Sequence, residues 1–280
     1  MPPTRRTFIR TLGATALGLA AGRRALLAAA ATHSKLKRIG IQLYTLRDEV
    51  SKDLGGVLAR LAQIGYKEVE FAGYGAHTAA EIRALLRKNG LTAPSAHIAL
   101  SAIEKDPKKT FRDAKTVGHQ WITVPSPPGR PQTADDWKRI AEQFNRVGAR
   151  VKAAGLRFAY HNHNAEFKKV GDVVPLELLL KETDPVLVSY EMDIYWVVNG
   201  GGDPLDLLAR YPGRFKMFHV KDSMGPPDHK MADVGAGTID FKTIFARAKG
   251  IQHYFVEHDE SADPFASAKA SYDYLARLEF

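Results

Sequence analysis

Two histidines stand at the end of a strand-like stretch of the chain, residues 156–163. Alternate side chains of an extended chain point to the same side, so His161 and His163 would share a face with Ala159. Imidazoles bind transition metals and carry protons near neutral pH, and the carboxylate of Glu166 follows three residues later. Two histidines taken alone are more often solvated loop residues, so the other strands must decide whether this stretch belongs to a site.

Six other strand-like stretches also carry polar or ionisable side chains near their C-terminal ends. Alternation places these groups on a consistent face of each strand, opposite apolar neighbours. Any one of them could be a core polar group with a hydrogen-bond partner, but seven strands that agree indicate a shared, charged site. The groups on the six strands are Gln42 and Tyr44, Glu68 and Glu70, His97, Ser189 with Glu191 and Asp193, His219 with Lys221, and Glu257.

The strand-like stretches alternate with helix-like stretches, and the starts of successive strands are about 23 to 39 residues apart, enough for one crossover helix. The eight predicted strands cover residues 38–44, 68–71, 91–97, 120–124, 156–161, 186–193, 214–220 and 253–257. Helices are indicated by a capping box at 78–81, an apolar stripe from Trp137 to Val151, and Asp-Pro pairs at 203–204 and 263–264. Eight such units predict an α/β fold, a single-domain (β/α)8 TIM barrel with its site at the C-terminal ends of the strands. A doubly wound open sheet is the alternative, but no Gly-x-Gly-x-x-Gly turn follows the first strand.

Four groups at the predicted barrel mouth form a mixed nitrogen and oxygen ligand set: His161, Asp193, His219 and Glu257. Buried, unpaired carboxylates are costly, and a divalent cation is a usual compensation. The chain has no cysteine, which excludes thiolate ligands and cysteine nucleophiles. The set suits Mn²⁺, Zn²⁺, Co²⁺ or Fe²⁺ better than Ca²⁺, with Mn²⁺ as the leading choice.

The first 31 residues are expected to be an export signal and not part of the fold. Arg5 and Arg6 resemble a twin-arginine motif, an uncharged run covers residues 11–22, and an alanine-rich run covers residues 25–31. Two further arginines at 23–24 interrupt the region before it reaches the roughly 20 apolar residues that cross a bilayer. We therefore expect the twin-arginine machinery to export the protein to the periplasm, with no stable membrane anchor and with residues 32–280 as one domain.

The charge of the expected mature domain argues against a nucleic-acid partner. The chain has 40 basic and 31 acidic residues, a net charge of +9, but five of the arginines lie in residues 1–31. The remainder carries 35 basic and 31 acidic residues, a net charge of +4. This small excess is not the basic stripe typical of nucleic-acid binders, so a small carbohydrate is the expected partner. Either a monomer or a homodimer is compatible with the sequence.

Six motifs run from the first predicted strand to the last: GIQLYTLR at 40–47, YHNHN at 160–164, MDIYW at 192–196, FHVKD at 218–222, VGAGTIDF at 234–241 and FVE at 255–257. With these motifs the chain resembles the xylose isomerase-like TIM barrels. This sugar phosphate isomerase/epimerase superfamily also contains inosose dehydratases, keto-sugar 3-epimerases and endonuclease-four-type DNA repair enzymes. The resemblance implies metal ligands at the ends of strands five to eight, usually Glu, Asp, His and Glu. Asp193, His219 and Glu257 match the last three positions, whereas His161 replaces the first glutamate.

The resemblance also implies roles for further residues. Glu257, Glu166 or His163 would move protons as a general base, Glu191 is another substitute for the missing carboxylate, and Lys221 would orient or polarise the substrate. Glycine clusters at 200–202 and 235–237 could expose backbone amides to a phosphate, although such clusters are usually turns. The expected substrate-binding residues are Gln42, Tyr44, Glu70, His97, Glu191 and Trp196.

These features predict a metal-dependent sugar isomerase or epimerase that acts on a carbohydrate or keto-sugar through an enediolate. The histidine at position 161 makes an elimination more credible, so the alternative is a keto-glycoside lyase or hydrolase, or an inosose-type dehydratase. A non-catalytic periplasmic sugar-binding barrel, with Tyr44, Tyr195 and Trp196 as stacking platforms, is the alternative of another class. An endonuclease is disfavoured because Asp228-His229 lacks the spacer residue of the Asp-x-His pair in the repair enzymes.

Overall fold

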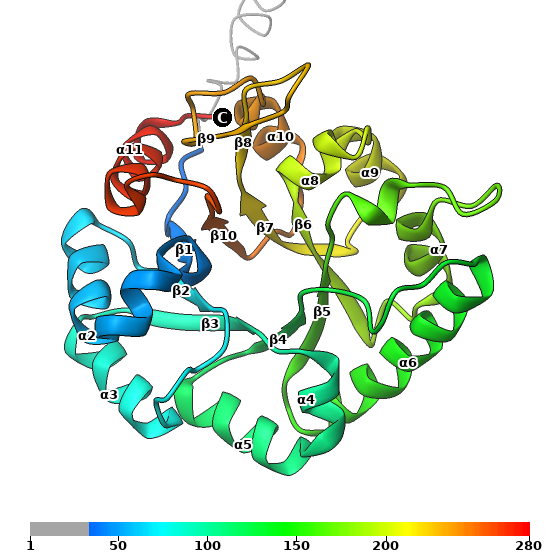
Figure 1. The fold of residues 1–280 in the computed structure, drawn as a ribbon, viewed down its shortest axis with the longest axis horizontal. Coiled ribbons are helices and arrows are strands. Elements are labelled where there is room, and N and C mark those ends of the chain that lie inside the picture. Colours follow the sequence, from blue (N-terminus) through cyan, green and yellow to red (C-terminus); the bar gives the residue numbers. More distant parts are fainter. Residues whose placement is uncertain (1–33) are drawn as a thin grey trace, which may run out of the picture. The chain divides into compact units, whose positions relative to one another are not determined.

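Eight parallel strands close into a barrel in the computed structural model, which describes residues 34–280 (Figure 1). The expected export signal, residues 1–31, lies outside the described residues. The barrel closes where β1 pairs with β10, and the (β/α)8 fold predicted from the sequence is confirmed. The barrel strands are β1 (Gly40–Gln42), β2 (Glu68–Phe71), β3 (Thr92–His97), β4 (Trp121–Val124), β5 (Arg157–His161), β6 (Val188–Asp193), β7 (Phe215–Val220) and β10 (His253–Val256).

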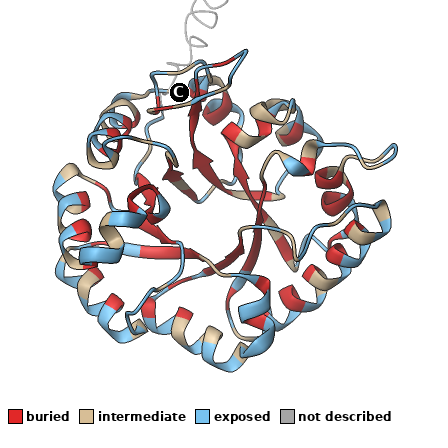
Figure 2. Cartoon of the chain, in the orientation of Figure 1, coloured by how far each residue is buried: buried red, intermediate tan, exposed pale blue. Residues whose placement is uncertain are grey.

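Helices surround the barrel, with buried faces turned toward the strands and exposed faces turned outward (Figure 2). The apolar stripe from Trp137 to Val151 is buried on α6, and a capping box at Thr78 begins α3, as predicted. No helix within residues 34–280 is long and apolar enough to cross a membrane. The helices are α2 (Arg47–Ile64), α3 (Ala79–Lys88), α4 (Leu100–Lys105), α5 (Pro107–Val117), α6 (Ala134–Ala153), α7 (Pro175–Glu182), α8 (Ile194–Asn199), α9 (Pro204–Arg210), α10 (Phe241–Arg247) and α11 (Pro264–Arg277), with 3-10 turns η2 (Leu43–Leu46) and η3 (Ala165–Phe167).

The first strand ends earlier than predicted. Beyond Gln42 the chain turns into η2, and the Gln42 side-chain oxygen accepts a hydrogen bond from the backbone N–H of Tyr44 at 3.2 Å. Tyr44 therefore does not share the interior strand face with Gln42, and 45% of its surface is exposed. The prediction that both residues share one strand face is wrong, because a helical turn breaks the alternation that it assumed.

The end of β5 is fastened to the end of β6 by one side chain. Asn162 donates from Nδ2 to the carbonyl oxygen of Asp193 at 3.3 Å and accepts from the Asp193 N–H at 3.2 Å. Because β5 ends at His161, His163 lies beyond the strand, in the turn that leads to η3. The two imidazole rings nevertheless remain in contact, with ring centres 4.8 Å apart.

The interior of the barrel is layered. Trp121, Ala159, Met217 and Phe255 form a buried apolar cluster. One alternation further along each strand, the same interior face carries polar groups, among them His161 on β5 and His219 on β7. The apolar layer thus separates the polar C-terminal end of the barrel from its N-terminal end.

Both predicted glycine clusters use their backbone amides within the fold. Asp222, on the short strand β8 (Asp222–Ser223) that pairs with β9 (Met231–Ala232), accepts from the N–H groups of Gly235 at 2.9 Å and Gly237 at 3.0 Å. A Cβ atom at Gly237 would lie 2.3 Å from the Asp222 carboxylate, so glycine is required for this approach. The N–H groups of residues 200–202 donate to carbonyl oxygens of α8. Both clusters are therefore turns, the usual role of such clusters, and their bonded amides do not form a phosphate site.

Candidate active site

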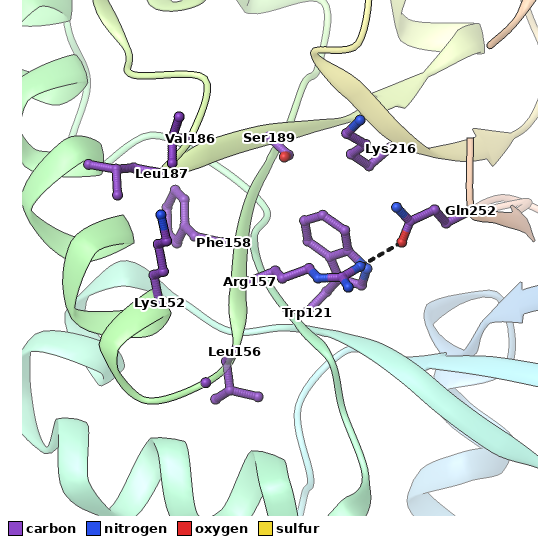
Figure 3. Close-up of a pocket in the computed structure, with 11 residues that line it drawn as sticks. Trp121, Lys152, Leu156, Arg157, Phe158, Val186, Leu187, Ser189, Lys216 and Gln252 are labelled. Atoms are coloured by element: carbon purple, nitrogen blue, oxygen red, sulfur yellow. Dashed lines mark hydrogen bonds between the residues drawn. The ribbon is translucent and has the colours of Figure 1, made fainter. Parts of the chain in front are cut away.

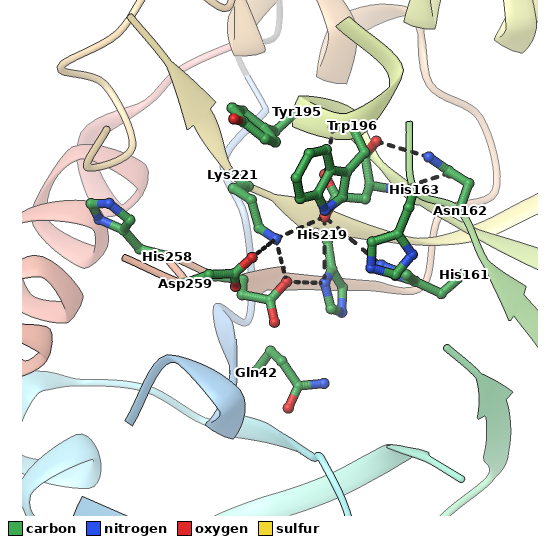
Figure 4. Close-up of polar contacts among 12 residues, drawn as sticks. Gln42, His161, Asn162, His163, Tyr195, Trp196, His219, Lys221, His258 and Asp259 are labelled. Atoms are coloured by element: carbon green, nitrogen blue, oxygen red, sulfur yellow. Dashed lines mark hydrogen bonds and ion pairs between the residues drawn. The ribbon is translucent and has the colours of Figure 1, made fainter. Parts of the chain in front are cut away.

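Lys221 lies at the centre of a buried group of carboxylates at the mouth of the barrel (Figure 4). Its ammonium nitrogen is 2.8 Å from Glu257 Oε2, 2.9 Å from Asp259 Oδ2 and 3.2 Å from Asp193 Oδ2. Only 1% of its surface is exposed. Burial alone would lower the pKa of Lys221, but the three carboxylates outweigh it and raise the pKa above its usual value. Lys221 is therefore a fixed positive charge beside the substrate space.

His219 places both of its ring nitrogens against carboxylates. Its Nδ1 atom is 2.9 Å from Glu257 Oε2, and its Nε2 atom is 2.7 Å from Glu70 Oε2 and 3.2 Å from Glu191 Oε2. Burial lowers the pKa of His219, but Glu191 and Glu257 outweigh this effect and raise it well above the usual range. In metal sites, a carboxylate that contacts one ring nitrogen of a histidine orients the ring so that the other nitrogen can bind the metal. Glu70 contacts Nε2 in this way and fixes the ring, whether Nδ1 faces Glu257 or a metal.

Beneath the mouth, one carboxylate oxygen joins three imidazoles. Glu191 Oε2 is 2.8 Å from His97 Nε2, 3.1 Å from His161 Nδ1 and 3.2 Å from His219 Nε2. Burial raises the pKa of Glu191, but the surrounding imidazoles outweigh it and hold the pKa well below its usual value. This carboxylate therefore orients the histidines. Its Oε2 atom is fully used by the three imidazoles and cannot bind a substrate at the mouth.

Glu70 and Gln42 complete the layer below the mouth. Gln42 Nε2 donates to Glu70 Oε2 at 2.8 Å, and the two residues are neighbours in the β1–β2 register. Burial and the nearby Glu191 carboxylate raise the pKa of Glu70. Gln42, Glu70 and Glu191, which the sequence analysis assigned to substrate binding, are fully buried and bind the side chains that form the site.

Asp193, His219 and Glu257 have the geometry of three ligands to one divalent ion. Their nearest donor atoms all lie within 4.8 Å of one another, and His219 Nδ1 is 2.9 Å from Glu257 Oε2 and 3.9 Å from Asp193 Oδ2. Ligands about 2.1 Å from a common ion are about 3 to 4 Å apart, so this spacing fits. Asp193 Oδ2 is buried, forms no hydrogen bond within the described chain and faces the Lys221 ammonium at 3.2 Å, so its remaining lone pairs can accept a metal cation.

His161, the fourth predicted ligand, lies at the edge of this triad. Its Nε2 atom is 3.9 Å from Asp193 Oδ2, whereas its Nδ1 atom faces Glu191. His161 also belongs to a second group with metal-ligand spacing, together with His97, Glu191 and His219. Burial and the nearby His219 lower the pKa of His161 well below its usual value, so its ring is a neutral donor suited to metal coordination.

A cavity of about 560 Å³ opens above these groups. His163 lines it, and the ring of His163 lies 5.7 Å from the ring of Trp196. No hydrogen bond to a ring nitrogen of His163 is formed within residues 34–280, because its contacts are with other rings and through its backbone N–H. The cavity is lined by Tyr44, Ala72, Gly73, His97, Ala99, Pro125, His161, His163, Lys221, Glu257 and Asp259.

The aromatic residues after β6 lie beside Lys221 instead of lining this cavity. The Lys221 nitrogen is 5.4 Å from the centre of the Trp196 ring and 6.0 Å from that of Tyr195. Tyr195 donates a hydrogen bond from its hydroxyl to the backbone carbonyl of His229 at 2.7 Å, which holds its ring in place. Trp196 and Tyr195 therefore cover the lysine, and Tyr44 is the aromatic residue in the cavity wall.

Glu166 is not at the mouth, so its predicted role as the base is corrected. It is fully buried, accepts a hydrogen bond from the Tyr160 hydroxyl, and accepts another from the His163 backbone N–H at 3.1 Å. Tyr160 lies on the outward face of β5 and packs against Phe144 of α6. The 3-10 turn η3 directs the carboxylate behind the strand, where it anchors the turn that carries His163.

Asp259 is a site residue that sequence reasoning missed. It lies beyond the end of β10, and Glu257 and Asp259 both contact Lys221. Its position two residues after Glu257 is the signal in the sequence, but Asp259 lies in a turn, where the period of two no longer applies.

A second hollow, of about 450 Å³, lies at the other end of the barrel (Figure 3). It is lined by residues at the starts of strands, among them Arg157 and Lys216, and Arg157 donates to Gln252 at 2.8 Å. Active sites of TIM barrels lie at the C-terminal ends of the strands, so this hollow is not the candidate site.

The chain belongs to the xylose isomerase-like TIM barrel family, because residues 58–278 match the model of that family. A solved structure of a sugar phosphate isomerase/epimerase from Parabacteroides distasonis is 31% identical, with a TM-score of 0.76 over 89% of this chain and 96% of that one. The family and fold that the motifs predicted are therefore confirmed.

Two inosose dehydratases are also similar to this chain. That of Lacticaseibacillus casei is 31% identical over 165 residues, which are 51% of this chain and 55% of that protein, so the chain spans about half the length of this relative. That of Geobacillus kaustophilus is 25% identical over 268 residues, 79% of this chain and 86% of that protein. Both of these relatives are named inosose dehydratase.

Proposed function

We propose that the protein is a lyase that removes water or an alcohol from a keto-sugar or keto-cyclitol bound at the barrel mouth. The observation that carries the proposal is that one cavity holds both the fixed Lys221 ammonium and the His163 ring, whose nitrogens have no protein hydrogen bond within the described residues. The first can stabilise negative charge on oxygen, and the second can accept and return a proton. The similarity to inosose dehydratases supports the same class of reaction.

The elimination needs three changes in bonding. A ring nitrogen of His163 takes the proton from the carbon next to the substrate carbonyl, and the electron pair of that C–H bond forms the enolate. The enolate collapses to a carbon–carbon double bond as the bond to the β-oxygen breaks. His163 then returns its proton to the departing oxygen, so that water or an alcohol leaves with an unsaturated ketone as the second product.

Lys221 supplies the electrostatic part of this reaction. Its ammonium group lies in the cavity wall, where its positive charge can stabilise the carbonyl oxygen, which becomes negatively charged in the enolate. Asp193, His219, Glu257 and His161 would hold a divalent metal, which when bound polarises a carbonyl as a Lewis acid. Mn²⁺ remains the leading choice for this nitrogen and oxygen set.

A sugar isomerase or epimerase is the second proposal, and the similarity to the Parabacteroides distasonis protein favours it. It would use the same proton removal but return the proton to carbon. The difference from the two-glutamate relatives lies at His161, where an imidazole bound to Glu191 replaces the first carboxylate. With Glu166 behind the strand, Glu257 is the glutamate that remains in the cavity wall.

Product analysis in heavy water separates the two proposals. Metal-loaded protein is incubated with a panel of keto-cyclitols and keto-sugars, and products are followed by mass and by ultraviolet absorbance. A lyase yields an unsaturated ketone that has lost one water or alcohol, whereas an isomerase yields a product of unchanged composition that carries deuterium at carbon. Neither product nor deuterium exchange across the panel would reject both and favour a sugar-binding barrel.

A variant pair assigns the proton carrier. His163→Ala should lower kcat by about 100- to 1,000-fold, the usual contribution of a general base. Asn164→Ala is the matched control, because Asn164 lies in the same turn but donates to Asn199 and not into the cavity. Equal activity of both variants would remove His163 from the mechanism.

A further inference from the structure

A second, mostly apolar groove of about 280 Å³ opens beside the mouth cavity. It lies between η2 with the start of α2 and the loop that follows β2, residues 72–78. The groove and the mouth cavity share Tyr44, Ala72 and Gly73, so the two spaces adjoin along one boundary. The apolar side chains of the groove are Leu43, Val50, Leu54, Phe71 and Tyr74.

The aromatic side chains of this groove are held in fixed positions. The Tyr74 ring stacks on His119 with ring centres 5.7 Å apart and meets the edge of Phe71 at 6.0 Å. Across the groove, the Arg47 guanidinium lies 4.7 Å from the centre of the Tyr44 ring and donates to the Tyr44 carbonyl oxygen at 3.1 Å. A groove with rigid aromatic walls suits a flat, apolar ligand, because its side chains lose little conformational entropy when the ligand binds. The groove therefore has two features of a ligand subsite, an apolar slot and a direct boundary with the mouth cavity.

We propose that this groove binds the aromatic aglycone of a keto-glycoside whose sugar ring occupies the mouth cavity. The inference rests on the proposed lyase function and specifies its substrate: the departing group is the aglycone alcohol or phenol. The proton removed from the carbon beside the ketone returns to the glycosidic oxygen as the bond between that oxygen and the sugar carbon breaks. The products are an unsaturated keto-sugar and the free aglycone, and no oxidant or reductant is consumed.

A binding experiment with unreactive probes tests the groove independently of catalysis. 4-Nitrophenyl glucoside and methyl glucoside both lack the ketone, so the protein cannot convert either of them by this elimination. We expect calorimetry to show about tenfold tighter binding of the aryl glucoside, because its ring leaves water for the apolar groove. Equal affinity of the two probes would overturn the proposal.

A variant pair then places the aryl group in the groove. Ala76 is an exposed loop residue that lines the groove, so Ala76→Trp fills the space without disturbing the core. This variant should lose the tenfold preference for the aryl probe and keep the affinity for methyl glucoside, whereas the control Ala76→Ser should keep both. An aryl preference that survives in Ala76→Trp would show that the ring binds elsewhere and would overturn the proposal.

Kinetics with the corresponding keto-glycosides separates failure of this inference from failure of the proposed function. If the inference holds, kcat/KM for the aryl substrate exceeds that for the methyl substrate, and Ala76→Trp removes the difference through KM. Turnover of both substrates with equal kcat/KM would overturn the groove assignment and leave the lyase proposal intact. Tight aryl binding without turnover of any keto-glycoside would reject the lyase proposal and leave the groove as an aryl-binding site.

Discussion

Lys221 balances the charge of the site, because one buried ammonium faces the carboxylates of Asp193, Glu257 and Asp259. Replacing it with methionine keeps most of the length of the side chain but leaves these carboxylates without their cation. Loss of one partner of a buried ion pair costs about 3–5 kcal/mol, although metal binding would recover part of this. The electrostatic role predicts that kcat falls by about 100-fold in Lys221→Met.

Steady-state kinetics and thermal unfolding of the Lys221 variants check this prediction. Lys221→Arg is the matched control, since it retains the positive charge and should retain more of kcat than the methionine variant. A methionine variant with wild-type kcat would show that the ammonium only supports the fold.

Because His119 is buried, we predict that the protein loses stability in mild acid. This effect is independent of the candidate active site. It is buried, with Nδ1 2.6 Å from the Ala93 carbonyl oxygen, and burial lowers its pKa to about 4. The folded pKa lies below the unfolded value of about 6.5, so the unfolded chain binds the proton first as pH falls. The contribution to stability is complete above pH 6.5 and declines toward pH 4, with about 2 kcal/mol lost between pH 7 and pH 5.

Urea unfolding at pH 7 and pH 5 measures this effect. His119→Gln should lose about 2 kcal/mol less than wild type between the two pH values, whatever its stability at pH 7. His77→Gln, in an exposed loop, is the control and should behave as wild type. The same pH dependence in all three proteins would contradict the assignment to His119.

The turn after β5 is held by Glu166, and its role predicts a contrast between two substitutions. In Glu166→Gln, the amide can still accept from the His163 N–H and pair with the Tyr160 hydroxyl, so kcat should stay within about threefold of wild type. Glu166→Ala leaves both buried groups without a partner and should lower the free energy of unfolding by about 1–3 kcal/mol for each. A Glu166→Gln variant without activity, but with normal stability, would restore this residue as the base.

Alternation along single strands predicted much of this site, because it depends only on the spacing of residues in one extended segment. It placed His161, Asp193 and His219 on the interior face, and the capping signals predicted the helices between the strands. It failed at Tyr44, where a 3-10 turn replaces the strand, and the role that the resemblance gave to Glu166 failed because another 3-10 turn directs that side chain away from the mouth. The period of two holds only as far as the extended backbone continues.

Contacts between strands could not be predicted in the same way. The three imidazoles around Glu191 come from β3, β5 and β7, which are far apart in the sequence. The pattern within each strand predicts which face a side chain lies on. It does not predict the position of the side chain along the barrel axis or the residue that it contacts on another strand. Registers such as His161 beside Glu191 and Asp193 beside His219 are set by the closure of the whole barrel.

The barrel concentrates its buried charge at one end and its apolar packing below it, so that a bound cation would be coupled to the stability of the whole molecule. Three strands, β6, β7 and β10, must be in place before Asp193, His219, Glu257 and Lys221 can meet. An unfolded chain cannot assemble this set, so a metal that binds it stabilises the folded state by mass action.

This coupling predicts a metal-dependent rise in melting temperature that is specific to the ligand triad. Mn²⁺ at 100 times its Kd should add about 2.7 kcal/mol to the free energy of unfolding, about 5–10 °C for a domain of this size. Asp193→Asn should lose most of this shift, since Asp193 is both a triad member and a partner of Lys221. Asp259→Asn removes a carboxylate from the same lysine but lies outside the triad, so it should keep the shift. Calorimetry of chelator-treated proteins with and without Mn²⁺ distinguishes the two variants. If both lost the same part of the shift in melting temperature, Mn²⁺ would respond to the net charge around Lys221 and not to a coordination site.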